Sequence, residues 1–86
     1  MRVMIRFSLA RDPKNALRNE LKRTLELGGI KWAGSLTAIF EGYITERDLA
    51  TTMGLFWDAV RRHQPARISH FWMYADSKRA PVALPG

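Results

Sequence analysis

A chain of 86 residues with 14 Lys and Arg against 8 Asp and Glu carries a net charge of +6, which favours acidic partners such as nucleic acid. The lack of cysteine excludes disulfides, thiolate catalysis and cysteine-ligated zinc. No apolar run approaches the roughly 20 residues that span a bilayer, and the charged start is unlike a signal peptide, so we expect a cytoplasmic protein.

The first part of the chain predicts a strand followed by a helix. Apolar and polar residues alternate within residues 3–12, which is the period of a strand with one face against a core. The apolar positions of this strand are Val3, Ile5, Phe7 and Leu9. Asp12 and Pro13 then fit an N-cap and a first helical position, and leucines at fourfold spacing predict a helix over about residues 13–27, which two glycines end.

The middle of the chain predicts two short strands and a second helix. The stretch IKWAGSLTAIFEGYI is rich in apolar and β-branched residues, and Gly34 with Ser35 offers a turn or bulge inside it. Thr45 and Asp48 resemble a capping box that begins a helix, and Pro65 ends it. The apolar stripe of this helix consists of Leu49, Met53, Phe56, Trp57 and Val60.

A last strand, from about Ala66 to Ala75, completes the order βαββαβ. A polar turn over residues 76–79 and a short PVALP tail follow it. This order is typical of an α+β ferredoxin-like sandwich, in which two helices cover one face of a four-stranded antiparallel sheet. We therefore predict a single ferredoxin-like domain over residues 1–86, with the C-terminal residues as a tail or an extra strand.

The last strand carries large apolar side chains on both faces. Alternation assigns one face to Ile68, His70, Trp72 and Tyr74 and the other to Phe71 and Met73. A homodimer through the open sheet face would cover the exposed groups; in the alternative, the PVALP tail folds back over that face. We expect the homodimer, with an interface that includes Phe71, Trp72, Met73 and Tyr74.

Carboxylates that could converge on a metal ion are few. A Mg²⁺ site needs two or more of them at one point. Asp12 and Asp48 fit helix caps, whereas Glu41 and Asp76 are loose candidates at strand ends. The other acids fit solvated helical positions and are Glu20, Glu26, Glu46 and Asp58. We predict no metal site and no cofactor, with Asp12 as the one catalytic candidate.

Histidines and serines give no further catalytic set. His63 fits a helix C-terminus, where the helix dipole favours its charge, and His70 fits a strand at an interface. Neither has a partner at metal-ligand spacing. No nucleophile elbow and no glycine-rich phosphate loop occurs in the sequence.

The basic residues are better organised and predict two positive patches. Residues of the first patch follow fourfold spacing along the first helix, and those of the second lie around the end of the second helix. Together they are Lys14, Arg18, Lys22, Arg61, Arg62 and Arg67. Such patches suit contact with a nucleic-acid backbone; the alternative is a solvated face that keeps the protein in solution. The RNA-recognition aromatic motif is missing, so Trp32, Trp57 and Trp72 are expected in the core or at the dimer interface.

Over its whole length the chain resembles the small CRISPR-associated adaptation subunit and its relatives, the virulence-associated protein D ribonucleases. The resemblance rests on FSLARD, ALRNELKRTLELGG, IKWAGSLTAIFEGYIT and the PVALPG tail; AIFEG keeps Phe40, Glu41 and Gly42 of the family segment but has inserted residues before it. It implies a homodimer joined through the open sheet faces. It also implies a metal-binding catalytic aspartate near the end of the first strand, where this chain has Ser8, a poorer ligand for a hard cation.

These observations lead to one main hypothesis and two alternatives. We expect a basic, non-catalytic homodimer that contacts nucleic-acid backbone through the six residues named above. The first alternative is a residual metal-dependent endonuclease that uses Asp12. The second is an effector or toxin-like factor, of a phage or mobile-element type, that binds a partner protein.

Overall fold

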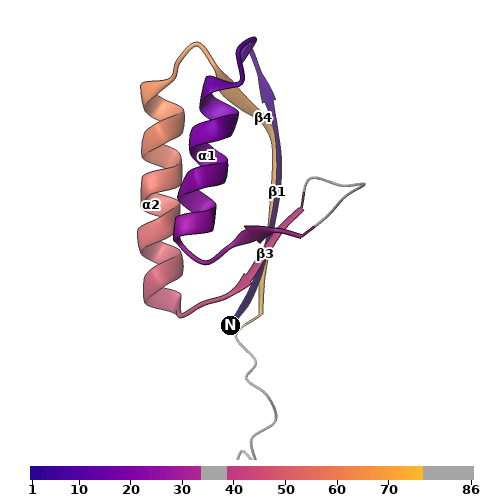
Figure 1. Cartoon of the computed structure of the whole chain (residues 1–86), viewed down its shortest axis with the longest axis vertical. Coiled ribbons are helices and arrows are strands. Elements are labelled where there is room, and N and C mark those ends of the chain that lie inside the picture. Colours follow the sequence, from indigo (N-terminus) through magenta and orange to yellow (C-terminus); the bar gives the residue numbers. More distant parts are fainter. Residues whose placement is uncertain (34–38, 77–86) are drawn as a thin grey trace, which may run out of the picture.

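The computed structural model describes residues 1–33 and 39–76, which form a sheet with two helices on one of its faces (Figure 1). In chain order the elements are β1 (Arg2–Ala10), α1 (Ala16–Leu27), β2 (Lys31–Trp32), β3 (Ile39–Tyr43), α2 (Glu46–Arg62) and β4 (Arg67–Asp76). The strands are antiparallel in the order β2-β3-β1-β4, so the predicted ferredoxin-like α+β fold is confirmed. The polar turn predicted over residues 76–79 is wrong at Asp76, which is the last residue of β4. The rest of that turn, the turn predicted at residues 34–35 and the tail lie outside the described residues.

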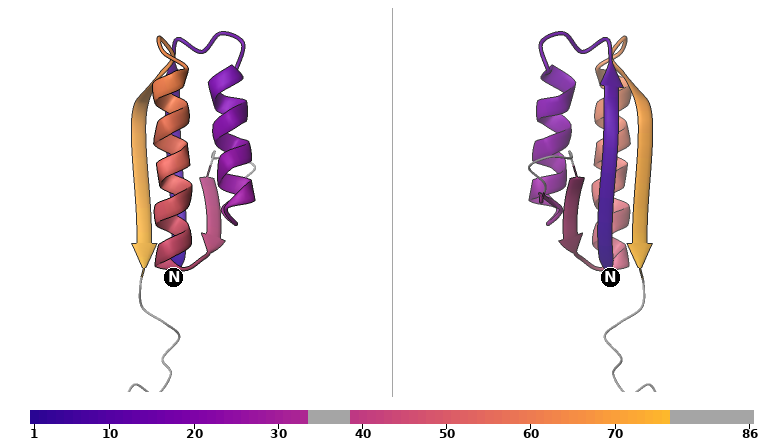
Figure 2. Two further views of the ribbon diagram at one scale, coloured as in Figure 1. Left: turned by 90° about the vertical axis from the view of Figure 1, so that its left-hand side faces the viewer. Right: turned by 90° about the vertical axis from the view of Figure 1, so that its right-hand side faces the viewer.

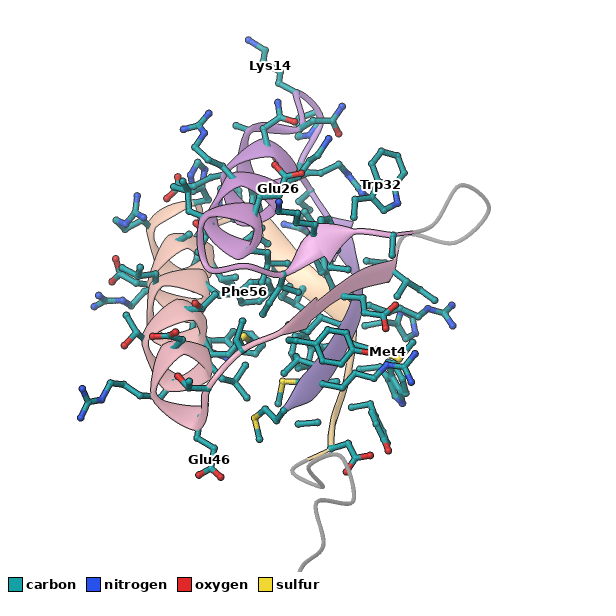
Figure 3. The ribbon with its side chains drawn as sticks, turned by 60° about the horizontal axis from the view of Figure 1, so that its bottom comes forward. Met4, Lys14, Glu26, Trp32, Glu46 and Phe56 are labelled. Carbon is teal, nitrogen blue, oxygen red and sulfur yellow. The ribbon has the colours of Figure 1, made fainter. Side chains whose placement is uncertain are left out.

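The core lies between the sheet and the two helices (Figure 2). Strand β1 contributes its alternate residues Val3, Ile5 and Phe7, which are almost fully buried as their spacing predicts. Helix α1 adds three leucines at fourfold spacing, and α2 adds Phe56, whose ring meets that of Phe7 edge to face at 5.5 Å. The opposite face of the sheet, which includes Met4, has no helix over it (Figure 3).

A β-bulge in β4 changes which residues share a face. Ser8 of β1 pairs with His70, but the next residue, Leu9, pairs with Ile68, so Ser69 is the extra residue. Ile68 therefore packs with Leu9 against the core. The prediction that Ile68 shares a face with His70 is wrong, because simple alternation takes no account of an inserted residue.

Helix α1 begins later than predicted. Residues 12–15 form a turn in which the Asn15 N–H donates to the Asp12 carbonyl at 3.1 Å, and Asn15 is the N-cap with a φ of 57°. Neither Asp12 as N-cap nor Pro13 as first helical residue is correct. The helix begins at Ala16 because Asn tolerates the left-handed conformation that this turn requires.

Helix α2 begins as predicted. The Thr45 hydroxyl accepts a hydrogen bond from the Asp48 N–H at 3.0 Å, and Glu46 and Asp48 place negative charge at the positive end of the helix. The helix ends at Arg62 with His63 as its C-cap, three residues ahead of Pro65. Its stripe packs toward the sheet and is completed by two small buried residues, Thr52 and Ala59.

Strand β3 passes very close to the turn that follows α1. A Cβ atom built on Gly42 would lie 2.0 Å from the carbonyl oxygen of Gly29, a backbone atom that has no room to move aside. Gly29 itself has a φ of 91°, which favours glycine. Both glycines are therefore required where α1 turns into β2.

Candidate nucleic-acid interface

On helix α1, Lys22 lies on the flank toward β2, where it contacts Trp32. Arg18 and Lys22 lie one turn apart on the helix, as predicted, whereas Lys14 lies in the turn that precedes it. Lys14 extends from the end of the molecule at which α1 begins (Figure 3). We call Lys14, Arg18 and Lys22 the α1 basic stripe. Within residues 1–33 and 39–76, none of the three forms an ion pair with a carboxylate.

Asp12 holds the beginning of α1 through its side chain. Its two carboxylate oxygens accept hydrogen bonds from the backbone N–H groups of Leu17 (3.1 Å) and Arg18 (3.0 Å). These are N–H groups of the first helical turn, which have no partner inside the helix. The predicted capping role of Asp12 is thus correct in kind, although it acts from three residues before the N-cap. Both oxygens are engaged with the helix, which leaves this carboxylate badly placed to bind a metal ion.

Trp32 extends the α1 basic stripe with an aromatic surface. The ammonium group of Lys22 lies 5.0 Å from the centroid of the Trp32 ring, a cation–π arrangement, and Trp32 is 51% exposed. Trp57 and Trp72 are also close to half exposed. Of the expectation that the tryptophans lie in the core or at the dimer interface, the first half is wrong, because the core is filled by other residues, mainly leucines and phenylalanines. The second half stays a prediction.

Two of the three residues of the second predicted basic patch, Arg61 and Arg62, are engaged with acids. Arg61 and Arg62, in the last turn of α2, both pair with Asp58, and Arg62 also reaches Glu20 of α1 at 2.5 Å. His63 Nε2 donates to the other Glu20 oxygen at 2.7 Å. Glu20, expected to be solvated, instead bridges the two helices. The sequence gives no local sign of this pair, because Glu20 and Arg62 are 42 positions apart.

This network shifts the titration of its members. Hydrogen bonds from Arg62 and then His63 hold the pKa of Glu20 below its ordinary value of 4.5. In the same way Arg61 and then Arg62 lower the pKa of Asp58, and Glu20 and Asp58 raise that of Arg62. The positive charge of Arg61 and Arg62 is thus largely balanced by neighbouring carboxylates.

Arg67, the last of the predicted binding residues, is exposed at the start of β4 and pairs across the sheet with Ala10. The turn that contains Lys14 and the loop that leads to Arg67 lie at the same end of the molecule (Figure 1). Arg67 thus shares an end of the domain with Lys14.

The end of β1 carries a cluster of hydroxyl and imidazole groups. The Ser8 hydroxyl lies 2.9 Å from the Ser69 hydroxyl and 3.2 Å from His70 Nδ1, because the bulge brings both residues opposite Ser8. The next cross-strand pair on this face of the sheet is Arg6 with Trp72. Alternation alone would not have brought Ser69 to Ser8. This is the position at which the family resemblance implies a catalytic aspartate, and it holds no carboxylate.

Two predicted loose acids also have assigned contacts. Glu41 of β3 accepts the Arg2 Nε hydrogen bond at 2.7 Å, and Asp76 accepts one from the Tyr74 hydroxyl at 3.2 Å. Across residues 1–33 and 39–76, no three His, Cys, Asp or Glu side chains gather into a set that could hold a metal ion.

The four residues predicted at a dimer interface lie on two faces of β4. Trp72 and Tyr74 pair with Arg6 and Met4 and share the open face with them. Phe71 lies on the helix side, where its ring contacts those of Phe56 and Trp57, and Met73 shares that side.

Comparisons with known proteins found no similar protein: no family model matches the chain, and neither the curated proteins nor the solved structures gave a match. The resemblance to the CRISPR-associated subunit and the virulence-associated protein D ribonucleases therefore stays a prediction. Neither of the described helices is long and apolar enough to cross a membrane.

Proposed function

We propose that the protein is a small, basic, cytoplasmic homodimer that binds the backbone of nucleic acid without cleaving it. The α1 basic stripe carries this proposal, because its three cations have no carboxylate partner among the described residues, unlike Arg61 and Arg62. Phosphates of a nucleic acid are suitable counter-charges for it. The net charge of +6 adds long-range attraction for such a polyanion.

Helix geometry supports contact with successive phosphates. Residues four apart rise by about 6 Å along a helix and lie on one side of it, so Arg18 and Lys22 can neutralise neighbouring groups of one strand. Lys14 extends the row beyond the start of the helix. Each neutralised phosphate releases a counterion, and such contacts give affinity without reading the base sequence.

Two local features of the protein argue against cleavage of the bound nucleic acid. Asp12 uses both carboxylate oxygens to hold the beginning of α1. Ser8 supplies a hydroxyl where a carboxylate would be needed, and hydroxyls are poor ligands for Mg²⁺ beside carboxylates. We therefore assign the protein a binding role, related to the CRISPR-associated and virulence-associated protein D folds in scaffold and not in chemistry.

The open sheet face supports the homodimer. It presents Trp72 and Tyr74, each more than 40% exposed, beside Met4 and two arginines. Tryptophan, tyrosine, methionine and arginine are the residues enriched at protein interfaces. A second copy on this face would leave α1 free, because the helices lie on the other side of the sheet.

Fluorescence anisotropy with labelled generic DNA, titrated across salt, tests the binding. We expect wild-type affinity to fall steeply with salt, and Arg18→Glu to weaken binding by about tenfold or more and to reduce the salt slope by about 1. Arg47→Glu is the matched control, because it makes the same charge change at the far end of the helix pair, where α2 begins. Equal losses in both variants would show that only net charge matters, and unchanged affinity in Arg18→Glu would overturn the proposed interface.

Sedimentation equilibrium tests the homodimer separately. We expect the wild type to dimerise and Trp72→Glu to shift the equilibrium toward monomer by more than tenfold, because a charge would be buried at the centre of the interface. Leu55→Glu, at an exposed position of α2 on the other side of the sheet, serves as a control. A wild-type protein that is monomeric at high concentration would contradict the homodimer.

A further inference from the structure

Trp32 lies at the rim of the domain in a position that packing alone does not explain. Strand β2 has two residues and forms one edge of the sheet. Within it Trp32 pairs with the core residue Phe40, so its side chain is on the helix side and next to α1. The indole is nevertheless 51% exposed and projects beyond the strand (Figure 3).

The contact with Lys22 joins this indole to the α1 basic stripe. The ammonium group 5.0 Å from the ring centroid covers one side of the ring and is attracted by its negative face. The exposed half of the side chain is turned toward solvent. The row from Lys14 through Arg18 to Lys22 thus ends on an accessible aromatic surface.

We propose that Trp32 stacks on one base of a single-stranded nucleic acid whose phosphates lie along the α1 basic stripe. This inference rests on the proposed function and specifies its substrate class. A cationic row that tracks the backbone, together with an aromatic ring for a base, is the arrangement that binds single strands without sequence preference. A duplex keeps its bases stacked inside, so it gains only the contacts to the cations.

The lysine contact also prepares the ring for this role. An ammonium group fixed on one side of the indole restricts its rotation, so less conformational freedom is lost when a base stacks on the other side. The same ammonium can also pair with a phosphate of the bound strand. Lys22 therefore acts on the backbone and positions Trp32 at the same time.

Affinity for a single strand and for a duplex of the same sequence, measured at one salt concentration, tests the assignment. We expect Trp32→Leu to weaken single-strand binding by about tenfold and to leave duplex binding within about twofold. Trp32→Phe keeps an aromatic face and should retain most of the single-strand affinity. Thermal melting of both variants confirms that they are folded.

The outcomes separate this inference from the proposed function. If Trp32→Leu weakens single-strand and duplex binding equally, or neither, while Arg18→Glu weakens both, the base-stacking role is wrong and backbone binding stands. If Trp32→Phe loses as much as Trp32→Leu, stacking is also wrong. A wild-type protein that binds neither nucleic acid at low salt would overturn the proposed function itself.

Discussion

The two flanks of helix α1 have similar polarity in the sequence but opposite surroundings in the fold. On the α2 flank, Glu20, Thr24 and Gly28 line a groove of 390 Å³ between the helices, and Glu20 forms ion pairs across it. On the β2 flank, Arg18 is exposed to solvent, and the half-buried Lys22 contacts Trp32. Cations beside a second helix find carboxylates, whereas cations above a two-residue strand remain available to a ligand. The comparison predicts that changes on the α2 flank affect stability and changes on the β2 flank affect binding.

Among changes on the α2 flank, a substitution at Gly28 is expected to have the largest effect on the free energy of unfolding. A Cβ atom added there would lie 2.2 Å from Thr52 Oγ1 and 2.7 Å from Thr52 Cγ2, on a buried, β-branched side chain that has little freedom to rotate. The φ of Gly28 is −83°, which alanine adopts without strain, so the effect is steric. We expect Gly28→Ala to lower the free energy of unfolding by about 1–3 kcal/mol in urea denaturation.

Two variants test the cause of this loss. Gly54→Ala, in the middle of α2 with nothing within 4 Å of its added Cβ, should raise stability by up to about 1 kcal/mol, because alanine favours the helix. Combining Gly28→Ala with Thr52→Ala should recover part of the lost stability by removing the clash. A Gly28→Ala protein as stable as the wild type would show that the helices separate easily and that the α2 flank is not closely packed.

Much of the fold follows from periodic patterns in the sequence. The alternation in β1 and the fourfold leucines of α1 are read directly from the chain, and Thr45 with Asp48 identifies the start of α2. These signals are local, because each depends on residues within one or two turns of each other. The βαββαβ order then leaves few topologies to consider.

The features that sequence reasoning missed depend on contacts between distant segments or on single backbone angles. The bulge at Ser69 reverses the face of Ile68 without any glycine or proline to mark it. Asn15 adopts a left-handed φ, and this shortens α1 at its start. The spacing of the α1 basic stripe was predictable from the sequence. The ion pairing of Arg62, which the stripe lacks, was not, because one of its partners is a carboxylate on the other helix.

Glu20 on the α2 flank gives a smaller expected effect on stability, but one with a specific pH dependence. We expect Glu20→Gln to lower stability at neutral pH by about 1 kcal/mol, since ion pairs at partly exposed positions contribute no more than this. The pKa of Glu20 is depressed in the folded protein, so its contribution is complete above the ordinary value of 4.5 and is lost as the pH falls through the folded-state pKa. The stability difference between wild type and variant should therefore shrink below pH 4.5.

Glu26→Gln, on the exposed surface of the same helix, is the control for this pH dependence. Glu26 forms no ion pair among the described residues, so its variant should follow the wild-type acid profile closely. Urea denaturation of the three proteins between pH 3 and pH 7 makes the comparison, and Glu20→Gln should keep the wild-type nucleic-acid affinity at neutral pH. If Glu20→Gln instead changes affinity and leaves the acid profile unaltered, the α2 flank takes part in binding and the two sides of α1 do not divide stability from function.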